Sequence, residues 1–259
     1  MVEGAGRWPV RRIVLVHGAG HGAWCWEHLT PELAVLGYQV QAPDLPGLGE
    51  DQTPPGAVTF DSYVTRVTGM LRSSPEPVVL VGHSLGGTTI SQVAEEAPEL
   101  VAKLVYLAAF LPCDGESAGD AVSATASATA GGKAGPRSGA LSISRNAGEH
   151  AHEFDAALAP DFFYNRCDPD TARWAACRLR PQANAPVAAR VRLSASRWGA
   201  VPKVYVQCTQ DRALPPDVQR SFCDRQPGVR RRVMDSDHSP FLSNVPALAA
   251  LLHEEAQAL

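Results

Sequence analysis

The sequence has 259 residues, 45% of them hydrophobic, and a chain of this size buries about three-quarters of the surface that it exposes when unfolded. Its 23 Lys and Arg against 27 Asp and Glu give a net charge of −4. Nucleic-acid phosphates are bound by clustered positive charge, so no nucleic-acid partner is expected. The longest apolar run, Leu104–Leu111, is far short of the ~20 residues that span a bilayer, and Ile13–Val16 is too short for a secretory leader, so we expect a cytoplasmic protein without a membrane span.

Short β-branched runs alternate with helical patterns along most of the chain. Strands are expected at Ile13–Val16, Tyr38–Ala42, Pro77–Val81, Leu104–Leu107, Val204–Cys208 and Val229–Met234. Helices are expected at Trp24–Leu36, Phe60–Leu71, Gly86–Ala97, Pro215–Cys223 and Pro246–Ala256. This alternation predicts an α/β protein with about six strands in a mostly parallel sheet, covered by helices on both faces. The basic run Arg230–Arg232 is then expected at the solvated edge of the last strand.

One region, 113–199, breaks this alternation. It shows no strand pattern, and Ala, Ser, Gly and Thr dominate residues 118–144, which predicts a flexible segment. Its second half carries aromatic residues at roughly helical spacing. We therefore expect a core made of residues 1–112 and 200–259, and an inserted helical cap at 113–199 whose first part is flexible.

A serine flanked by glycines follows the third expected strand, in the segment Gly82-His83-Ser84-Leu85-Gly86. The pattern G-x-S-x-G between a strand and a helix is typical of a sharp turn that holds a serine hydroxyl above a parallel sheet. The glycines are needed because a side chain at either position would crowd the turn. The sequence therefore predicts that Ser84 is a nucleophile.

A serine hydroxyl is a weak nucleophile, and it needs a histidine base that is oriented by a carboxylate. In this arrangement the acid and then the histidine follow the serine, on loops after later strands. Asp211 follows the strand that ends at Cys208, and His238 follows the strand that ends at Met234. Asp217 is the nearest rival acid, but it lies in the first turn of an expected helix, where the helix dipole accounts for it.

Acyl transfer also needs backbone N–H groups that stabilise the oxyanion. One is expected from Leu85, directly after the nucleophile, and the other from Ala19 in the glycine-rich loop after the first strand.

No metal or cofactor is expected. His17 and His21 are four residues apart, but the Gly-Ala-Gly between them does not form a helix and no third ligand is near. The six cysteines are scattered without a metal or disulfide pattern, which favours reduced thiols.

Over nearly its whole length the chain resembles an α/β-hydrolase, in the plant methylesterase and hydroxynitrile-lyase branch that includes the salicylic-acid-binding methyl salicylate esterase. The segments that carry the resemblance are LVHGAGHGAW at 15–24, VGHSLGG at 81–87, LAAFLP at 107–112, VYVQCTQD at 204–211 and SDH at 236–238. The resemblance implies a triad of Ser84, Asp211 and His238, with oxyanion donors at Ala19 and Leu85. It also implies a helical cap above a small, largely apolar pocket, whose expected walls are Gly18, Phe110, Phe154, Phe162, Phe163 and Trp174.

Two departures separate the branches. The lyases carry a threonine directly after the position of His17, and a lysine directly after the catalytic histidine that stabilises the leaving cyanide. This chain has Gly18 and Ser239 there, so the resemblance favours ester hydrolysis. The family's pocket-facing tryptophan early in the cap also has no counterpart between Cys113 and Ala151, so salicylate-like specificity does not follow.

The sequence thus favours a cofactor-free serine hydrolase of a small or medium carboxylic ester, working through an acyl-enzyme. Two other hypotheses stay open on the same scaffold. One is non-hydrolytic chemistry, either cyanohydrin cleavage or a biosynthetic cyclisation, with His238 as a base, and the other is a ligand receptor with slow turnover. The expected partner is a small-molecule ester, and a homodimer is left open.

Overall fold

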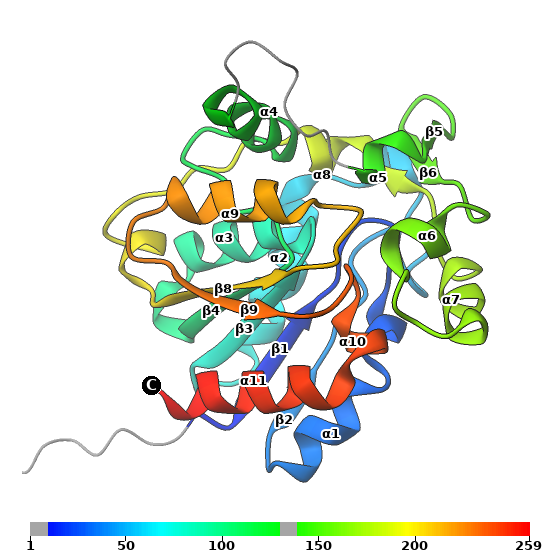
Figure 1. Cartoon of the computed structure of the whole chain (residues 1–259). Coiled ribbons are helices and arrows are strands. Elements are labelled where there is room, and N and C mark those ends of the chain that lie inside the picture. The colour runs from blue at the N-terminus through cyan, green and yellow to red at the C-terminus, as the bar shows by residue number, and fades with distance from the viewer. Residues whose placement is uncertain (1–9, 130–138) are drawn as a thin grey trace, which may run out of the picture.

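The structure, a computed structural model, describes residues 10–129 and 139–259. At its centre lies a six-stranded sheet whose neighbouring strands are all parallel, in the order β2-β1-β3-β4-β8-β9 (Figure 1). Its strands are β1 (Arg12–Val16), β2 (Gln39–Gln41), β3 (Val78–His83), β4 (Val101–Leu107), β8 (Lys203–Cys208) and β9 (Arg230–Met234). The parallel sheet expected from the sequence is therefore confirmed, and Arg230–Arg232 lies on its edge strand β9.

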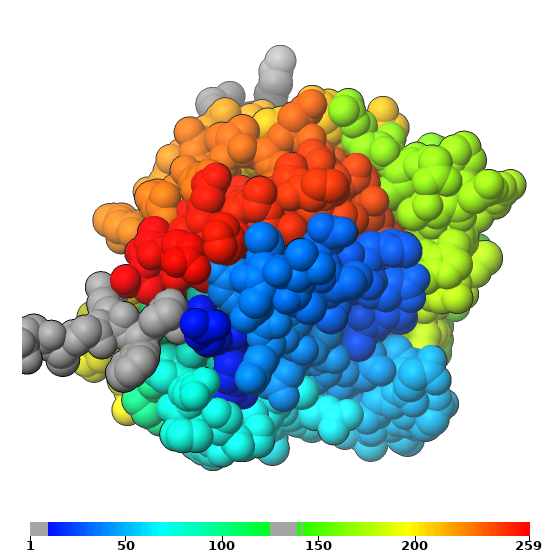
Figure 2. Space-filling view, turned by 90° about the horizontal axis from the view of Figure 1, so that it is seen from below, coloured from blue at the N-terminus to red at the C-terminus, as the bar shows by residue number. Residues whose placement is uncertain are grey.

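Helices cover both faces of this sheet, as expected. One face carries α2 (Phe60–Arg72), α3 (Gly86–Glu96) and α9 (Pro216–Asp224), and the other carries α1 (Leu29–Val35), α10 (Pro240–Ser243) and α11 (Val245–Gln257). Figure 2 shows α1 and α11 side by side on the outer surface. Short 3₁₀ turns complete the core at Ala23–Trp26, Pro55–Ala57, Pro98–Leu100 and Trp198–Ala200.

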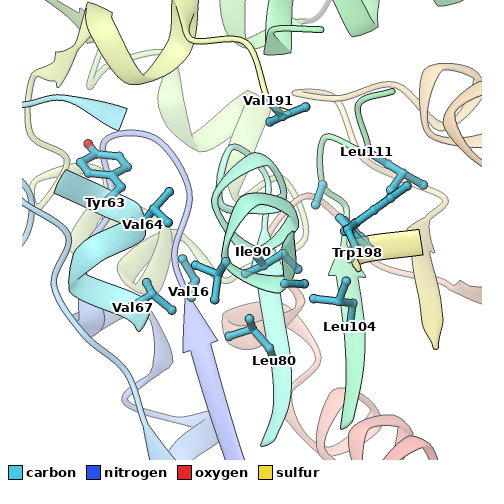
Figure 3. Close-up of a cluster of buried hydrophobic side chains, with 14 of the residues drawn as sticks. Val16, Tyr63, Val64, Val67, Leu80, Ile90, Leu104, Leu111, Val191 and Trp198 are labelled. Atoms are coloured by element: carbon cyan, nitrogen blue, oxygen red, sulfur yellow. The ribbon is translucent and has the colours of Figure 1, made fainter. Parts of the chain in front are cut away.

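The near-continuous apolar strands follow from burial on both sides. Val16 of β1 lies in one buried cluster with Val67 of α2 and Ile90 of α3 on one face (Figure 3). On the other face Leu15, the preceding residue, packs with Leu33 and other residues of α1 and α11. Because successive side chains point to opposite faces, a strand between two helical layers needs an apolar residue at every position.

The inserted region is not purely helical, which corrects the prediction of a helical cap. It contains a small antiparallel sheet of β5 (Ser144–Asn146), β6 (Ala151–Phe154) and β7 (Gln182–Ala183). Its helices are α4 (Ala118–Thr129), α5 (Gly139–Ser142), α6 (Ala159–Phe163), α7 (Pro169–Ala176) and α8 (Asn184–Ala188). Strands this short are missed because they hold too few residues for an alternating pattern to show.

The segment 118–144 was expected to be flexible, yet helix α4 forms its first part. The alanines that suggested an unanchored segment are also the strongest helix formers. Residues 130–138 lie outside the described part of the chain. Helix α4 packs against α8 and α9, apart from β5, β6, α6 and α7 (Figure 1), and α8 links it to the small sheet through the bond between the N–H of Asn184 and the carbonyl of His150. The domain boundaries at 112 and 200 remain a prediction.

Among the described residues, no helix has the length and apolar character needed to cross a bilayer.

Candidate active site

The first element of the site is the tight turn between β3 and α3. Ser84 follows the last residue of β3 and has a φ of 50°, in the left-handed region that non-glycine residues rarely occupy. Its N–H donates to the carbonyl of Leu107 at 3.2 Å, and its own carbonyl accepts from the N–H of Phe110 at 3.0 Å. The chain that leaves β4 therefore holds the strained conformation in place, with the serine side chain partly exposed.

The glycines around this turn have no room for side chains. A Cβ on Gly86 would lie 2.8 Å from the carbonyl oxygen of Val16, and one on Gly87 would lie 2.1 Å from that of Phe110. The helix after the serine thus begins wedged between the ends of β1 and β4, which explains why the sequence needs glycine there.

Asp211 and His238 meet beyond the carboxyl ends of β8 and β9. Nδ1 of His238 donates to Oδ2 of Asp211 at 2.7 Å, and both side chains are buried. The N–H groups of Ala213 and Leu214 donate to the other carboxylate oxygen, each at 2.8 Å. Because Nδ1 carries the proton, Nε2 of His238 presents a lone pair on the opposite side of the ring.

Burial raises the pKa of the Asp211 carboxyl above its ordinary value, while His238 and the two N–H donors act in the opposite direction. The rival Asp217 is exposed and forms a surface ion pair with Arg220. The structure therefore brings Asp211, and not Asp217, to the histidine.

The loop after β1 presents backbone groups next to the serine. A Cβ on Gly18 would lie 2.7 Å from Cβ of Ser84, so the loop backbone passes close to the serine. The carbonyl of Gly18 accepts from Nδ1 of His17 at 3.0 Å. Among the loop and turn hydrogen bonds of the described residues, none uses the N–H of Ala19 or of Leu85. Both groups are free to act as donors.

Three buried histidines surround this loop, and burial lowers the pKa of each. The pKa of His21 falls to about 3, that of His17 is lowered, and that of His83 lies well below its usual value. The hydrogen bonds of His17 fit a neutral ring, because its Nε2 accepts from the N–H of Leu45 at 3.1 Å. His17 and His21 thus use their ring nitrogens to hold backbone and side-chain groups. Among the described residues, no group of three His, Cys, Asp or Glu could hold a metal ion.

The expected pocket residues differ in their distance from the candidate catalytic groups. The ring of Phe163 lies 5.6 Å from that of His238, and Phe154 contacts both Phe163 and the position of a Cβ on Gly20. Phe110 adjoins the serine turn through its backbone and packs against Phe222, and Phe162 is partly buried in the cap core. Trp174 instead packs on Trp24 and under the guanidinium of Arg178, away from the histidine, so the structure does not bring it to the site.

Sequence reasoning missed three polar side chains that support the site. Nε2 of Gln219 on α9 donates to Oδ2 of Asp211 at 2.8 Å, and Oε1 of Gln182 accepts from the N–H of Gly20 at 3.3 Å. The third is His83, next to the serine, whose Nε2 donates to the backbone carbonyl of His238 at 2.9 Å. No sequence pattern marks these residues, because each hydrogen bond joins two separate elements of the fold.

Together these groups place a hydroxyl, an imidazole paired with a carboxylate, and two free N–H groups at one edge of the sheet. Such a set suits nucleophilic attack on a carbonyl carbon.

Comparisons with known proteins agree with this architecture. The sequence matches the alpha/beta hydrolase family over residues 13–251. It is 30% identical to methylesterase 7 of Arabidopsis thaliana, over 95% of this chain and 96% of that protein. It is 31% identical to the chloroplastic protein named methylesterase 14 of the same plant, with 96% of this chain matching 72% of that protein. For the chloroplastic protein named methylesterase 13, at 30% identity, the match spans 58% of that protein's length.

Solved structures show the same fold. A pyrethroid hydrolase from Sphingobium faniae superposes with a TM-score of 0.84 at 27% identity, covering 96% of this chain and 98% of that one. A methylesterase from Arabidopsis superposes with a TM-score of 0.80 at 25% identity, covering 96% of this chain and 100% of that one. The resemblance seen in the sequence is confirmed, and the chain belongs to the alpha/beta hydrolase family, with methylesterases among its relatives.

Proposed function

We propose that the chain is a serine hydrolase of small or medium carboxylic esters, with Ser84, Asp211 and His238 as its triad. The observation that carries the proposal is the 2.7 Å hydrogen bond between Asp211 and His238, together with a serine held in a left-handed turn whose preceding residue, His83, donates to the backbone carbonyl of His238 at 2.9 Å. Membership in the alpha/beta hydrolase family and the methylesterase relatives support ester hydrolysis as the reaction.

In the proposed mechanism, Nε2 of His238 takes the proton of Ser84 as Oγ attacks the ester carbonyl carbon. Asp211 keeps the other proton on Nδ1 and stabilises the imidazolium that forms. The N–H groups of Ala19 and Leu85 bind the oxygen that gains negative charge. The intermediate then collapses to an acyl-enzyme as the alcohol leaves with the proton of His238. Water, activated by the same histidine, releases the carboxylic acid.

The surroundings of the site favour an uncharged ester with an apolar acyl group. Phe163 and Phe154 place aromatic rings beside His238 and the loop after β1.

Two positions support hydrolysis over cyanohydrin cleavage. The threonine of the lyases would collide at Gly18, where even a Cβ would lie 2.7 Å from Cβ of Ser84. The position of the lyase lysine holds Ser239, which is completely buried and uncharged. That position therefore offers no cation to stabilise a departing cyanide.

The test is hydrolysis of a panel of short-chain methyl and nitrophenyl esters by the purified protein. Replacing Ser84 with alanine is expected to lower kcat by about 10⁵–10⁶, because the nucleophile and its base act as a unit. Ser91→Ala is the matched control, since Ser91 is a buried serine of α3 bonded to Tyr106, and it should retain activity. Full activity in Ser84→Ala would refute the assignment.

Two further measurements address the other hypotheses. Rapid cyanide release from mandelonitrile would show a lyase, and we expect none. Tight ligand binding in a calorimeter with no ester turnover would show a receptor. A cytoplasmic location and a homodimer both remain predictions, and the relatives named methylesterase 13 and 14 are chloroplastic.

A further inference from the structure

One turn of the cap, residues 164–167, lies against three of the four segments that carry the proposed catalytic groups, all but the serine turn. Nδ2 of Asn165 donates to the carbonyl of Gln210 at 3.2 Å, directly before the acid of the triad. The N–H of Arg166 donates to Oδ2 of Asp237 at 2.8 Å, directly before the base. The hydroxyl of Tyr164 is bonded to Nε2 of His21 at 2.9 Å, in the loop after β1.

The tyrosine contact leads through His21 to the carbonyl of Ala19, the residue whose N–H is the proposed oxyanion donor. Nδ1 of His21 donates to the carbonyl of Ala19 at 2.8 Å, so Nε2 must accept, and the hydroxyl of Tyr164 is the donor. Both side chains are buried, and the pKa of His21, lowered to about 3, keeps the ring in this neutral tautomer. Tyr164 therefore fixes His21, and His21 fixes the orientation of the Ala19 carbonyl.

The cap also bonds to both backbone groups of Gly20. The N–H of Gly20 donates to Oε1 of Gln182 at 3.3 Å, and its carbonyl accepts from the N–H of Arg180 at 2.8 Å. The peptide between Ala19 and Gly20 is thus bonded at both its carbonyl and its N–H. With those groups occupied, the N–H of Ala19 is left free beside the nucleophile.

The base loop shows the same dependence on this turn. Asp237 is fully buried, and its Oδ1 accepts from the N–H of Ser239 at 3.0 Å and from the hydroxyl of Ser243 at 2.6 Å. Its Oδ2 accepts from Arg166 of the cap turn. One buried carboxylate therefore ties the residues on either side of His238 to the cap.

We propose that the cap turn 164–167 is a positioning element for the catalytic loops, and that Tyr164 acts through His21 to hold the oxyanion-hole loop in its reactive geometry. This inference rests on the proposed ester hydrolysis. A cap that covered the substrate only as a roof would not need these bonds to the loops beneath it.

The experiment replaces Tyr164 with phenylalanine, which keeps the ring and removes the hydroxyl. We expect kcat for a methyl ester to fall about tenfold with KM within twofold, because a slightly displaced donor weakens binding of the transition state and not of the substrate. Affinity for a trifluoromethyl ketone, which forms a tetrahedral adduct with an oxyanion, should fall by the same factor. Affinity for the matching methyl ketone should not change.

Tyr38→Phe is the matched control. Its hydroxyl is bonded to Nδ1 of His253 at 2.9 Å, a buried tyrosine paired with a histidine far from the catalytic loops. This variant should lose stability in the same way while keeping kcat and both ketone affinities. Asn165→Ala provides a second variant, with an expected fall in kcat of about threefold at unchanged KM.

The outcomes are separable. If the wild-type protein hydrolyses esters and both cap variants keep kcat and trifluoromethyl ketone affinity within twofold, the positioning role is wrong. If kcat falls equally in Tyr38→Phe, the effect is general destabilisation and the inference is likewise wrong. If the wild-type protein shows no hydrolysis that depends on Ser84, the proposed function is wrong and this inference falls with it.

Discussion

Two buried carboxylates lie toward opposite ends of the central sheet, and their surroundings differ. Near the amino ends of β4 and β9, Glu255 of α11 meets three cations: Lys103 at 3.4 Å, Arg232 at 2.7 Å and Arg230. Beyond the carboxyl ends of β8 and β9, Asp211 meets His238 and N–H donors, and no Lys or Arg of the described chain contacts it.

The difference separates a stabilising cluster from a reactive one. The charge of Glu255 is permanently compensated, so that cluster holds the last helix to the sheet. The charge of Asp211 finds a full counter-ion only when His238 takes a proton, which is the event that the proposed reaction requires. Substitutions at one end should therefore change activity, and substitutions at the other should change stability.

The largest expected effect is at the reactive end. Asp211→Asn should lower kcat for ester hydrolysis by about 10⁴, because the amide favours the wrong tautomer of His238. The matched control is Asp217→Asn, where an exposed carboxylate pairs only with Arg220, and kcat should stay within about twofold. A large loss in the control, with little loss in Asp211→Asn, would show that the acid is misassigned.

The next effect is at the stabilising end. Glu255→Gln should lower the free energy of unfolding by about 3–5 kcal/mol, because it leaves the buried Lys103 without its carboxylate partner. Activity of the folded enzyme should not change. Denaturant unfolding measures the loss, with Glu254→Gln as a control that changes it by less than about 1 kcal/mol, since Glu254 is exposed. Lost activity in folded Glu255→Gln would contradict the separation of the two ends.

The smallest effect, counted per pH unit and per histidine, is a pH dependence of the free energy of unfolding. It arises at the reactive end. Burial lowers the pKa of His17, His21 and His83 from 6.5, so below that pH the unfolded chain binds protons that the folded protein excludes. The free energy of unfolding should therefore fall as the pH falls below 6.5, by at most about 1.4 kcal/mol per pH unit for each histidine. For His21 this loss continues down to about pH 3.

Urea unfolding between pH 7.5 and 5 tests this dependence. His21→Gln should remove one histidine's share of the slope. An unchanged slope in His21→Gln would mean that this histidine is not excluded from protonation in the folded state.

The sheet, and the strands after which the candidate catalytic residues lie, could be predicted from the sequence. Long apolar strands and glycine-rich turns leave strong sequence patterns. Ser84 stands in such a turn, and Asp211 and His238 each follow a recognisable strand. The cap was predicted less well. Its strands β5 to β7 are too short to show a period, and a helix of Ala and Ser reads as an unstructured segment.

The supporting side chains were not predictable for a different reason. Gln182 and His83 act through hydrogen bonds to loops far away in sequence, and Gln219 reaches Asp211 from the helix that follows it. A contact of this kind leaves no periodic or local signal, since it depends on how separate loops meet after the sheet has formed. Trp174 shows the reverse case, in which an aromatic residue with suitable spacing packs outside the site.

The left-handed conformation of Ser84 makes the serine a reporter of folding. Its backbone bonds to Leu107 and Phe110 exist only when β4 is docked against β3. A free chain avoids this conformation at a non-glycine residue, so a compact intermediate without that docking would hold an unreactive serine. During refolding, ester hydrolysis should thus return at the same rate as the pairing of β3 with β4. Enzyme activity would then report when the middle of the sheet has assembled.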